Sequence, residues 1–281
     1  MQTTSHNKNE FNSALRFLYR TAFGRLILKL ISCRSVSKAA GLFLDSFLSK
    51  FMIKRFIKKN GIDMSQFEDR DFKSFNDFFT RKLLKNSRVI ETDPSALISP
   101  CDSRLSVYEI TEKSVFNIKG TPYSVESLLQ NSDLAKEFSN GLCLIFRLCT
   151  DDYHRYCYFD SGSKGKNIFI KGKLHTVQPI AFERYDVYAE NCREYTIMNS
   201  DNFGKAVQIE VGALLVGKIS NLHNEHTFKR GDEKGMFEFG GSTIVLLLKK
   251  DSAVISQEIL ENSEKGIETV IKYGEAIGRK A

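Results

Sequence analysis

The 281-residue sequence lacks any apolar run long enough to cross a bilayer as a helix. Such a helix needs about 18 to 20 consecutive, mainly apolar residues, and every apolar run here is shorter. The N-terminus also lacks a secretory leader, and none of the six cysteines forms a Cys-x-x-Cys pair. These absences predict a protein that does not span a membrane by helix and whose cysteines are reduced thiols in the cytosol.

Metal motifs and repeats are missing as well. His223 and His226 come closest to a metal motif, but they lie in a polar stretch with no obvious third ligand, so we expect no metal site. The sequence contains no internal repeat and no low-complexity tract. With 42% apolar residues it is typical of a folded globule, either one large domain or a domain with an appendage.

Acidic residues are scarce at the start of the chain. Residues 1–60 contain twelve Lys and Arg side chains against two acidic ones, which gives this segment a charge of +10. The whole chain carries +7, so the remainder carries −3. The positive field is therefore a property of the first fifth of the chain.

Two stretches of this basic segment have helical periodicity. Apolar residues recur from Phe11 to Leu30, and again from about Ala39 to Lys59, where Gly61 is a natural stop. Basic amphipathic helices rich in Phe and Leu bind lipid headgroups, but they also pack as ordinary helices on their own domain, and both readings stay open here. Nucleic acid is disfavoured as a partner, because the segment has no binding motif and no Gly/Arg-rich character.

The rest of the chain changes from helical to strand-like periodicity. Residues 71–84 carry an apolar stripe at helical spacing, after which short apolar or alternating segments predict strands. Strands are predicted over residues 105–110, 142–146, 168–170, 174–177, 207–211, 214–216 and 242–248, and helices over 125–138 and 264–277. The predicted fold is therefore α+β: a basic helical N-terminal region (1–65) followed by a mainly antiparallel, β-rich body (66–281) whose last strand begins at Ser242.

The tetrapeptide Gly240-Gly241-Ser242-Thr243 precedes the buried run 244–248. A Gly-Gly pair between two apolar segments is typical of a tight turn in a two-strand hairpin, and the tetrapeptide alone favours that structural interpretation. Glycine also has no β-carbon, which leaves the Gly241 carbonyl accessible to the hydroxyl of Ser242. The second interpretation makes Ser242 a candidate nucleophile.

Two further residues are candidates for proton chemistry. Asp102 lies in a turn-forming cluster before a predicted strand, where an Asp usually bonds its own backbone. His154 lies among Tyr153, Arg155 and Cys157, which are able to shift its pKa or orient its ring. A single histidine is more often structural, so neither residue is assigned a function on local grounds.

Five segments, in one order, resemble the phosphatidylserine decarboxylase proenzymes. They are Phe-Phe-Thr-Arg-Lys-Leu, Ser-Pro-Cys-Asp-Ser, Asp-Tyr-His-Arg, Val-Gly-Ala-Leu-Leu-Val-Gly and the stretch from Lys-Arg-Gly-Asp to Gly-Gly-Ser-Thr, at residues 78–83, 99–103, 152–155, 211–217 and 229–243. The resemblance covers roughly residues 70–250. Two positions depart from it: Gly240 stands where many members have Leu, and Cys157 stands where many have a second histidine. We therefore take His154 as the relay histidine and keep His175 as the alternative.

The resemblance implies that Ser242 attacks the Gly241 carbonyl, with Asp102 and His154 activating its hydroxyl. It implies two chains, 1–241 and 242–281, that remain associated, and a pyruvoyl cofactor made from Ser242 itself. The implied reaction converts phosphatidylserine to phosphatidylethanolamine and carbon dioxide, with no metal.

The resemblance also favours the lipid interpretation of the N-terminal helices, which implies peripheral binding to an anionic membrane surface on the cytoplasmic face of the cell membrane. Two alternatives are kept. One is a cysteine hydrolase that uses Cys157, and the other is a non-enzymatic lipid-binding module of the same fold.

Overall fold

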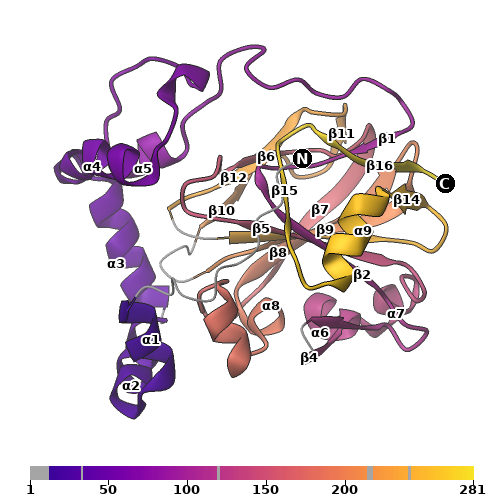
Figure 1. Ribbon diagram of the computed structural model, residues 1–281, viewed down its shortest axis with the longest axis horizontal. Helices are drawn as coiled ribbons and strands as arrows, with labels where there is room; N and C mark the ends of the chain where they lie inside the picture. Colours follow the sequence, from indigo (N-terminus) through magenta and orange to yellow (C-terminus); the bar gives the residue numbers. More distant parts are fainter. Residues whose placement is uncertain (1–12, 33, 119–120, 214–217, 240–241) are drawn as a thin grey trace.

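The computed structural model describes residues 13–32, 34–118, 121–213, 218–239 and 242–281. A column of N-terminal helices stands beside a body built mainly of β-strands (Figure 1). The described part thus has the predicted α+β architecture. The strand predicted at residues 214–216 and the residues Gly240 and Gly241 lie outside the described residues. None of the described helices is both long and apolar enough to span a bilayer.

The basic segment folds into short helices rather than the two long ones predicted. They are α1 (Ser13–Arg20), α2 (Ala22–Ile31), α3 (Arg34–Asp45), the 3-10 turns η1 (Phe47–Lys50) and η2 (Met64–Gln66), and α4 (Phe51–Asn60). The first break falls at Thr21, which leaves helical geometry and accepts a hydrogen bond from the Gly24 backbone N–H. Such a side-chain cap starts a new helix. Gly61 ends α4 in the left-handed conformation, as predicted (φ 60°).

An aromatic core joins these helices to the next segment. The short helix α5 (Phe75–Phe79) is capped by Ser74 and buries three of its phenylalanines completely against Leu44 and Ile53. The helix predicted over 71–84 is thus confined to its centre. It ends at Thr80, whose N–H and hydroxyl both bond to the Asn76 carbonyl, and the chain then crosses to the body.

An eight-stranded antiparallel sheet forms the centre of the body, in the order β11-β7-β8-β9-β13-β5-β2-β15. Its strands are β2 (Ser103–Glu109), β5 (Leu142–Leu148), β7 (Gly162–Ile170), β8 (Arg193–Ser200), β9 (Gly204–Val211), β11 (His226–Phe228), β13 (Ser242–Leu248) and β15 (Thr269–Ile271). β13 is buried along its whole length and pairs with β5 on one edge and β9 on the other. The apolar run predicted as a buried strand is thus a central strand.

Three smaller sheets surround this sheet, together with short helices. The sheets are β1-β16-β14, β10-β12-β6 and β3-β4. Their strands are β1 (Ala96–Ile98), β3 (Val115–Ile118), β4 (Thr121–Ser124), β6 (Arg155–Cys157), β10 (Ile219–Asn221), β12 (Glu233–Phe237), β14 (Ala253–Ile255) and β16 (Ala276–Lys280), and the helices are α6 (Val125–Leu129), α7 (Ser132–Lys136) and α8 (Val187–Glu190), with the 3-10 turn η3 (Pro179–Glu183). β12 and β13 lie in different sheets, so the hairpin interpretation of the Gly-Gly pair is wrong. Both edges of β13 are already occupied by β5 and β9.

Several local predictions are also wrong. Residues 264–277 do not form one helix: α9 (Gln257–Glu264) ends before Gly266, which has a φ of 70°, and β15 and β16 follow. The strand at Ser242 is therefore not the last. The helix predicted over 125–138 is divided by Gln130, which has a φ of 50°, into α6 and α7. Residues 174–177 form a loop instead of a strand.

Apolar cores cover both faces of the large sheet. Along β13, Ile244, Leu246 and Leu248 belong to one core, and Val245 and Leu247 to the other. This alternation follows from the period of two in a strand. The side chain of Ser242 shares the face of Ile244, and this core also contains Tyr19 and Leu28 from the N-terminal helices.

Candidate active site

Ser242 is the first residue of β13 and lies opposite Leu148 of β5. Its side chain is fully buried, and within the described residues its Oγ has no hydrogen-bond partner. A buried hydroxyl without a partner costs about 1–3 kcal/mol, so its presence calls for a physical explanation. The hydroxyl of Ser242 is thus buried at the head of the central strand, directly after the Gly-Gly pair.

The segment that leads to the Gly241–Ser242 bond is fixed by contacts with α5 and His154. The Phe237 N–H donates to the His154 carbonyl at 2.9 Å, and the Phe239 N–H donates to Asn76 Oδ1 at 3.0 Å. The Phe239 ring packs edge-on against Phe75 and Phe79, with centroid distances of 5.0 and 5.2 Å. Phe75 and Phe79 of α5 therefore hold the peptide on the N-terminal side of the Gly-Gly pair.

His154 is fully buried beside the same segment. Its ring lies 4.1 Å from the ring of Phe79, which also contacts Phe239. Its Nδ1 lies 2.9 Å from the Asp152 carbonyl oxygen. Because a carbonyl only accepts, Nδ1 carries the proton in this contact, and the lone pair of the neutral ring is then on Nε2. The structure thus places His154 next to the residues that approach the Gly-Ser bond.

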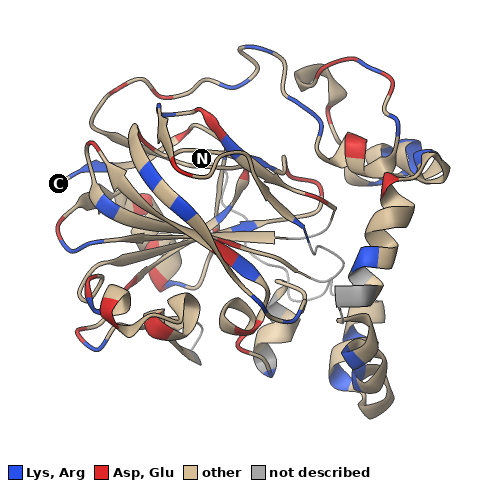
Figure 2. Ribbon diagram, turned by 180° about the vertical axis from the view of Figure 1, so that it is seen from behind, with Lys and Arg blue, Asp and Glu red and all other residues tan. Residues whose placement is uncertain are grey.

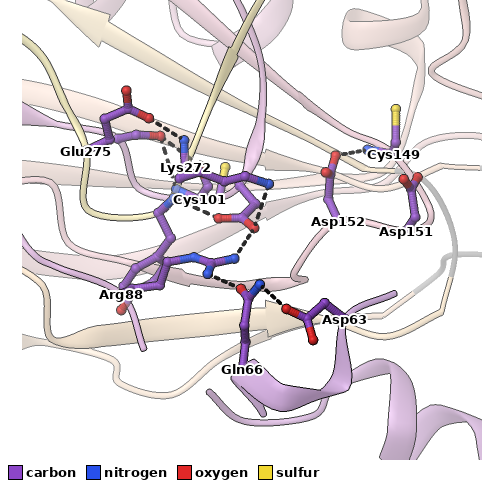
Figure 3. A network of polar contacts seen from close by, with 12 residues as sticks. Asp63, Gln66, Arg88, Cys101, Cys149, Asp151, Asp152, Lys272 and Glu275 are labelled. Carbon is purple, nitrogen blue, oxygen red and sulfur yellow. Dashed lines mark hydrogen bonds and ion pairs between the residues drawn. The ribbon is translucent and has the colours of Figure 1, made fainter. Parts of the chain in front are cut away.

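Asp102 is also buried, but its described hydrogen bonds have other partners. Its carboxylate accepts from the Tyr273 N–H at 2.8 Å, from Arg88 at 3.0 Å and from Lys272 at 3.4 Å. Figure 3 shows Arg88 and Lys272 in this polar network, with Gln66 bonded to Arg88 on its other side. The pairing of Asp102 with His154 therefore stays a prediction, and Asp102 connects the body to the segment that follows β15.

A pocket of about 220 Å³ opens beside this network. Arg88, Tyr153 and Tyr273 line it, together with Lys82 and Glu233. Two cations and one carboxylate thus face a small cavity next to Asp102. The pocket has the size and polarity for a charged group smaller than a whole lipid.

Asp152 is a candidate to which the sequence analysis assigned no role. It accepts a hydrogen bond from the Cys149 N–H at 2.7 Å, seen in Figure 3, and lies 3.4 Å from Arg104. Burial is the largest influence on this carboxyl and raises its pKa to about 6. Asp152 thus combines a carboxyl whose pKa is raised toward neutrality with a main-chain carbonyl that accepts from the His154 ring, which makes it a candidate for proton transfer. Its place in the Asp-Tyr-His-Arg segment was the available signal.

Cys157 does not fit the role of a nucleophile. Its side chain is fully buried, and burial raises the pKa of its thiol to about 12. A reactive cysteine needs the opposite, a lowered pKa and an exposed sulfur. The cysteine-hydrolase alternative is therefore not favoured.

His175, the alternative relay histidine, lies where the N-terminal helices meet the body. Its ring stacks on Tyr185 at a centroid distance of 4.0 Å, and Tyr19 of α1 approaches edge-on at 6.3 Å. Burial lowers the pKa of His175, while Glu190, at 3.9 Å, opposes this shift. His175 thus belongs to the aromatic cluster with Tyr185 on which Tyr19 of α1 packs.

The histidine pair considered as a metal motif is stacked ring on ring. His223 and His226 lie 3.9 Å apart, and the Tyr158 hydroxyl contacts His223. In the described part of the chain, no three side chains of the His, Cys, Asp or Glu type come together in a way that could hold a metal ion.

A family model described as phosphatidylserine decarboxylase matches residues 75–279. The chain is 52% identical to phosphatidylserine decarboxylase proenzyme 2 of Clostridium acetobutylicum over 274 residues, which is 97% of this chain and 94% of the relative. It is 43% identical to the phosphatidylserine decarboxylase proenzyme of Clostridium botulinum (95% and 92% covered) and 44% identical to that of Ruminiclostridium cellulolyticum (94% and 90% covered).

The names of these relatives describe them as proenzymes. The chain belongs to the phosphatidylserine decarboxylase family.

Proposed function

We propose that this protein is a phosphatidylserine decarboxylase that cleaves its own chain between Gly241 and Ser242 and converts Ser242 into a pyruvoyl group. The observation that carries the proposal is the hydroxyl of Ser242, which is buried at the head of the central strand and has no hydrogen-bond partner among the described residues. In a member of this family, such a residue is the natural candidate for the processing serine.

Self-cleavage begins with a proton transfer from Ser242 Oγ to His154. The oxygen attacks the Gly241 carbonyl carbon, the peptide C–N bond breaks, and the Ser242 nitrogen takes up the proton, which leaves an ester. Loss of the Ser242 α-proton then expels the Gly241 carboxylate and leaves dehydroalanine at residue 242. One water hydrolyses the dehydroalanine, which releases its nitrogen as ammonia and leaves the pyruvoyl ketone. No oxidant or reductant is needed in these steps.

Residue 242 fits a pyruvoyl group, because its side chain is already buried on the apolar face that contains Ile244 and Leu148. A pyruvoyl group there supplies a ketone that condenses with the substrate amine and accepts the electron pair released with carbon dioxide. The surrounding apolar side chains exclude water, which strengthens electrostatic interactions within the site. His154 and Asp152 are the groups on this chain that we assign to hold and move protons there.

The two chains stay associated after cleavage. The small chain, 242–281, contains β13, which keeps its hydrogen bonds to β5 and β9, and also β15 and β16, which pair with β2 and β1. Glu268 of the small chain accepts two hydrogen bonds from the buried Arg147 of the large chain. Breaking one peptide bond removes none of these contacts.

The N-terminal helices provide the surface that binds the membrane. Large apolar side chains stay exposed on them, among them Phe23 (66%), Leu42 (74%) and Phe51 (75%). Lys and Arg residues follow the same column of helices (Figure 2). Apolar insertion and attraction to anionic headgroups add together at such a surface, which favours peripheral binding to the cytoplasmic face of the cell membrane.

The test is the mass of the small fragment. Purified protein should give, under denaturing conditions, a large chain and a chain of residues 242–281 whose first residue has a ketone instead of an amine. Ser242→Ala should stay full length and inactive. A small fragment that begins with an ordinary serine, or a full-length protein that still decarboxylates phosphatidylserine, contradicts the proposal.

A further inference from the structure

The side chain of Asn191 is fully buried and bonds to three backbone groups. Its Oδ1 accepts from the His175 N–H at 2.9 Å, while its Nδ2 donates to the His175 carbonyl at 2.8 Å and to the Gly212 carbonyl at 2.7 Å. Because the amide is buried, water cannot replace these hydrogen bonds, and losing one of them leaves a polar group unpaired. Asn191 therefore fixes the loop at His175 and the end of β9 relative to each other.

Gly212 follows the last residue of β9. That residue, Val211, pairs with Thr243, the neighbour of Ser242 in β13. The N–H of Gly212 donates to the Cys192 carbonyl at 2.9 Å, and its carbonyl accepts from Asn191. Both backbone groups of Gly212 are thus held by residues 191 and 192.

The loop at His175, which Asn191 holds, is also the place where α1 packs on the body. The Thr176 N–H, next to His175, donates to the Tyr19 hydroxyl at 2.9 Å. Tyr19 is 2% exposed, and its ring packs edge-on against Tyr185 at 6.0 Å. The lipid-binding helices therefore rest on the loop that Asn191 holds.

We propose that Asn191 is a positioning residue: it fixes Gly212, which follows the strand partner of Thr243, and joins it to the loop at His175 on which α1 packs. The inference rests on the proposed function of Ser242. A shift of α1 on a lipid surface moves the loop at His175, and the shared amide passes this movement to Gly212. Lipid binding and the reaction at residue 242 are thereby coupled through one side chain.

The test uses the full-length chain with Asn191→Asp, which keeps the shape and the acceptor but removes both donated hydrogen bonds. We expect self-cleavage to slow at least tenfold. In the matured fraction we expect kcat on phosphatidylserine in mixed micelles to fall at least tenfold, with KM changed less than twofold. Asn262→Asp is the matched control, because Asn262 of α9 is also a buried amide and donates to Thr269. Both the cleavage rate and kcat should stay within twofold of the parent in this variant.

A second variant covers the case in which Asn191→Asp does not fold. Tyr19→Phe removes one buried hydroxyl and should lower kcat at least threefold, while binding to vesicles of anionic phospholipid is unchanged because Tyr19 does not face solvent. Unchanged kcat in either folded variant overturns the inference, as does a loss of vesicle binding that parallels the loss of kcat in Tyr19→Phe. An unmodified chain that neither cleaves nor decarboxylates contradicts the proposed function instead.

Discussion

Replacing Lys234 should reveal how strongly β12 is attached to the central sheet. Lys234 and Glu210 are both fully buried, and Lys234 Nζ lies 2.7 Å from Glu210 Oε1. Asn221 completes the network by accepting from Lys234 at 2.7 Å and donating to Glu210 at 3.1 Å. Lys234 belongs to β12 and Glu210 to β9, so the pair ties the strand that precedes the Gly-Gly pair to a strand next to β13.

Lys234→Met removes the cation and leaves the Glu210 carboxylate buried with only amide donors. Breaking a buried pair in this way costs about 3–5 kcal/mol, whereas replacing both partners by apolar groups is often neutral. For a chain of this size, about 2–4 °C of Tm corresponds to 1 kcal/mol. We therefore expect Tm to fall by roughly 6–20 °C for Lys234→Met, and Glu210→Leu in the same chain to restore most of it.

The measurement is thermal unfolding in a Ser242→Ala background, so that every molecule is one intact chain. Lys249→Met is the control, because Lys249 and Glu137 form a half-exposed pair (37% and 35%) whose loss should cost less than about 1 kcal/mol. A Tm within 2 °C of the parent, or a double variant no more stable than the single one, refutes the reasoning.

Three further predictions concern the site and the membrane. Asp102→Asn should slow self-cleavage at least about a hundredfold if Asp102 supports the histidine base. A normal rate on denaturing electrophoresis limits Asp102 to its structural contacts with Tyr273, Arg88 and Lys272. Burial raises the pKa of Asp152 above its unfolded value, so its stabilising contribution is complete below about pH 4 and lost as the pH rises through about 6. Asp152→Asn should therefore flatten the pH dependence of the free energy of unfolding in this range, measured by urea titration. An unchanged pH dependence contradicts the shift. Lys54→Glu with Lys58→Glu should weaken binding to anionic vesicles at least about thirtyfold at low salt and less at high salt. The control Lys136→Glu, on the body, should not weaken it. If the double variant and the control lose binding equally in sedimentation assays, the helices are not the docking surface.

The sequence could predict those elements whose signals are local. The run after Ser242 is short and continuously apolar, which is the pattern of a strand buried on both faces, and β13 is such a strand. Gly61 ends α4 because a left-handed residue stops a helix wherever it occurs. The fold class followed from the change of period after residue 84.

Pairing between distant segments could not be predicted in the same way. Nothing within Gly240-Gly241 indicates that β12 pairs with β6 and β10 while β13 inserts between β5 and β9. The terminal helix prediction failed for a related reason: Thr269 and Ile271 are buried because β15 pairs with β2, a partner more than 150 residues earlier in the chain. Tertiary pairing overrides local propensity in such segments.

The candidate site was predictable only where it lies within short motifs that resemble those of the family. Ser242 and His154 came from such motifs, and in the structure Phe79 contacts both His154 and Phe239. Asn191 carried no signal, because its role depends on three backbone groups that are brought to it by the fold.

The position of Ser242 at the very head of β13 explains how a chain could cut itself without losing its fold. From Thr243 onward, each residue of the strand is paired with β5, and through Leu248 also with β9, so the small chain is held in register on both edges. On the other side of the bond, Phe239 is held by Asn76 and the α5 aromatics. Gly240 and Gly241 lie between these anchors in the sequence, and the carbonyl that we propose Ser242 attacks belongs to Gly241. A serine two residues further into the strand would have the same hydroxyl, but the carbonyl before it would be bound in the sheet ladder.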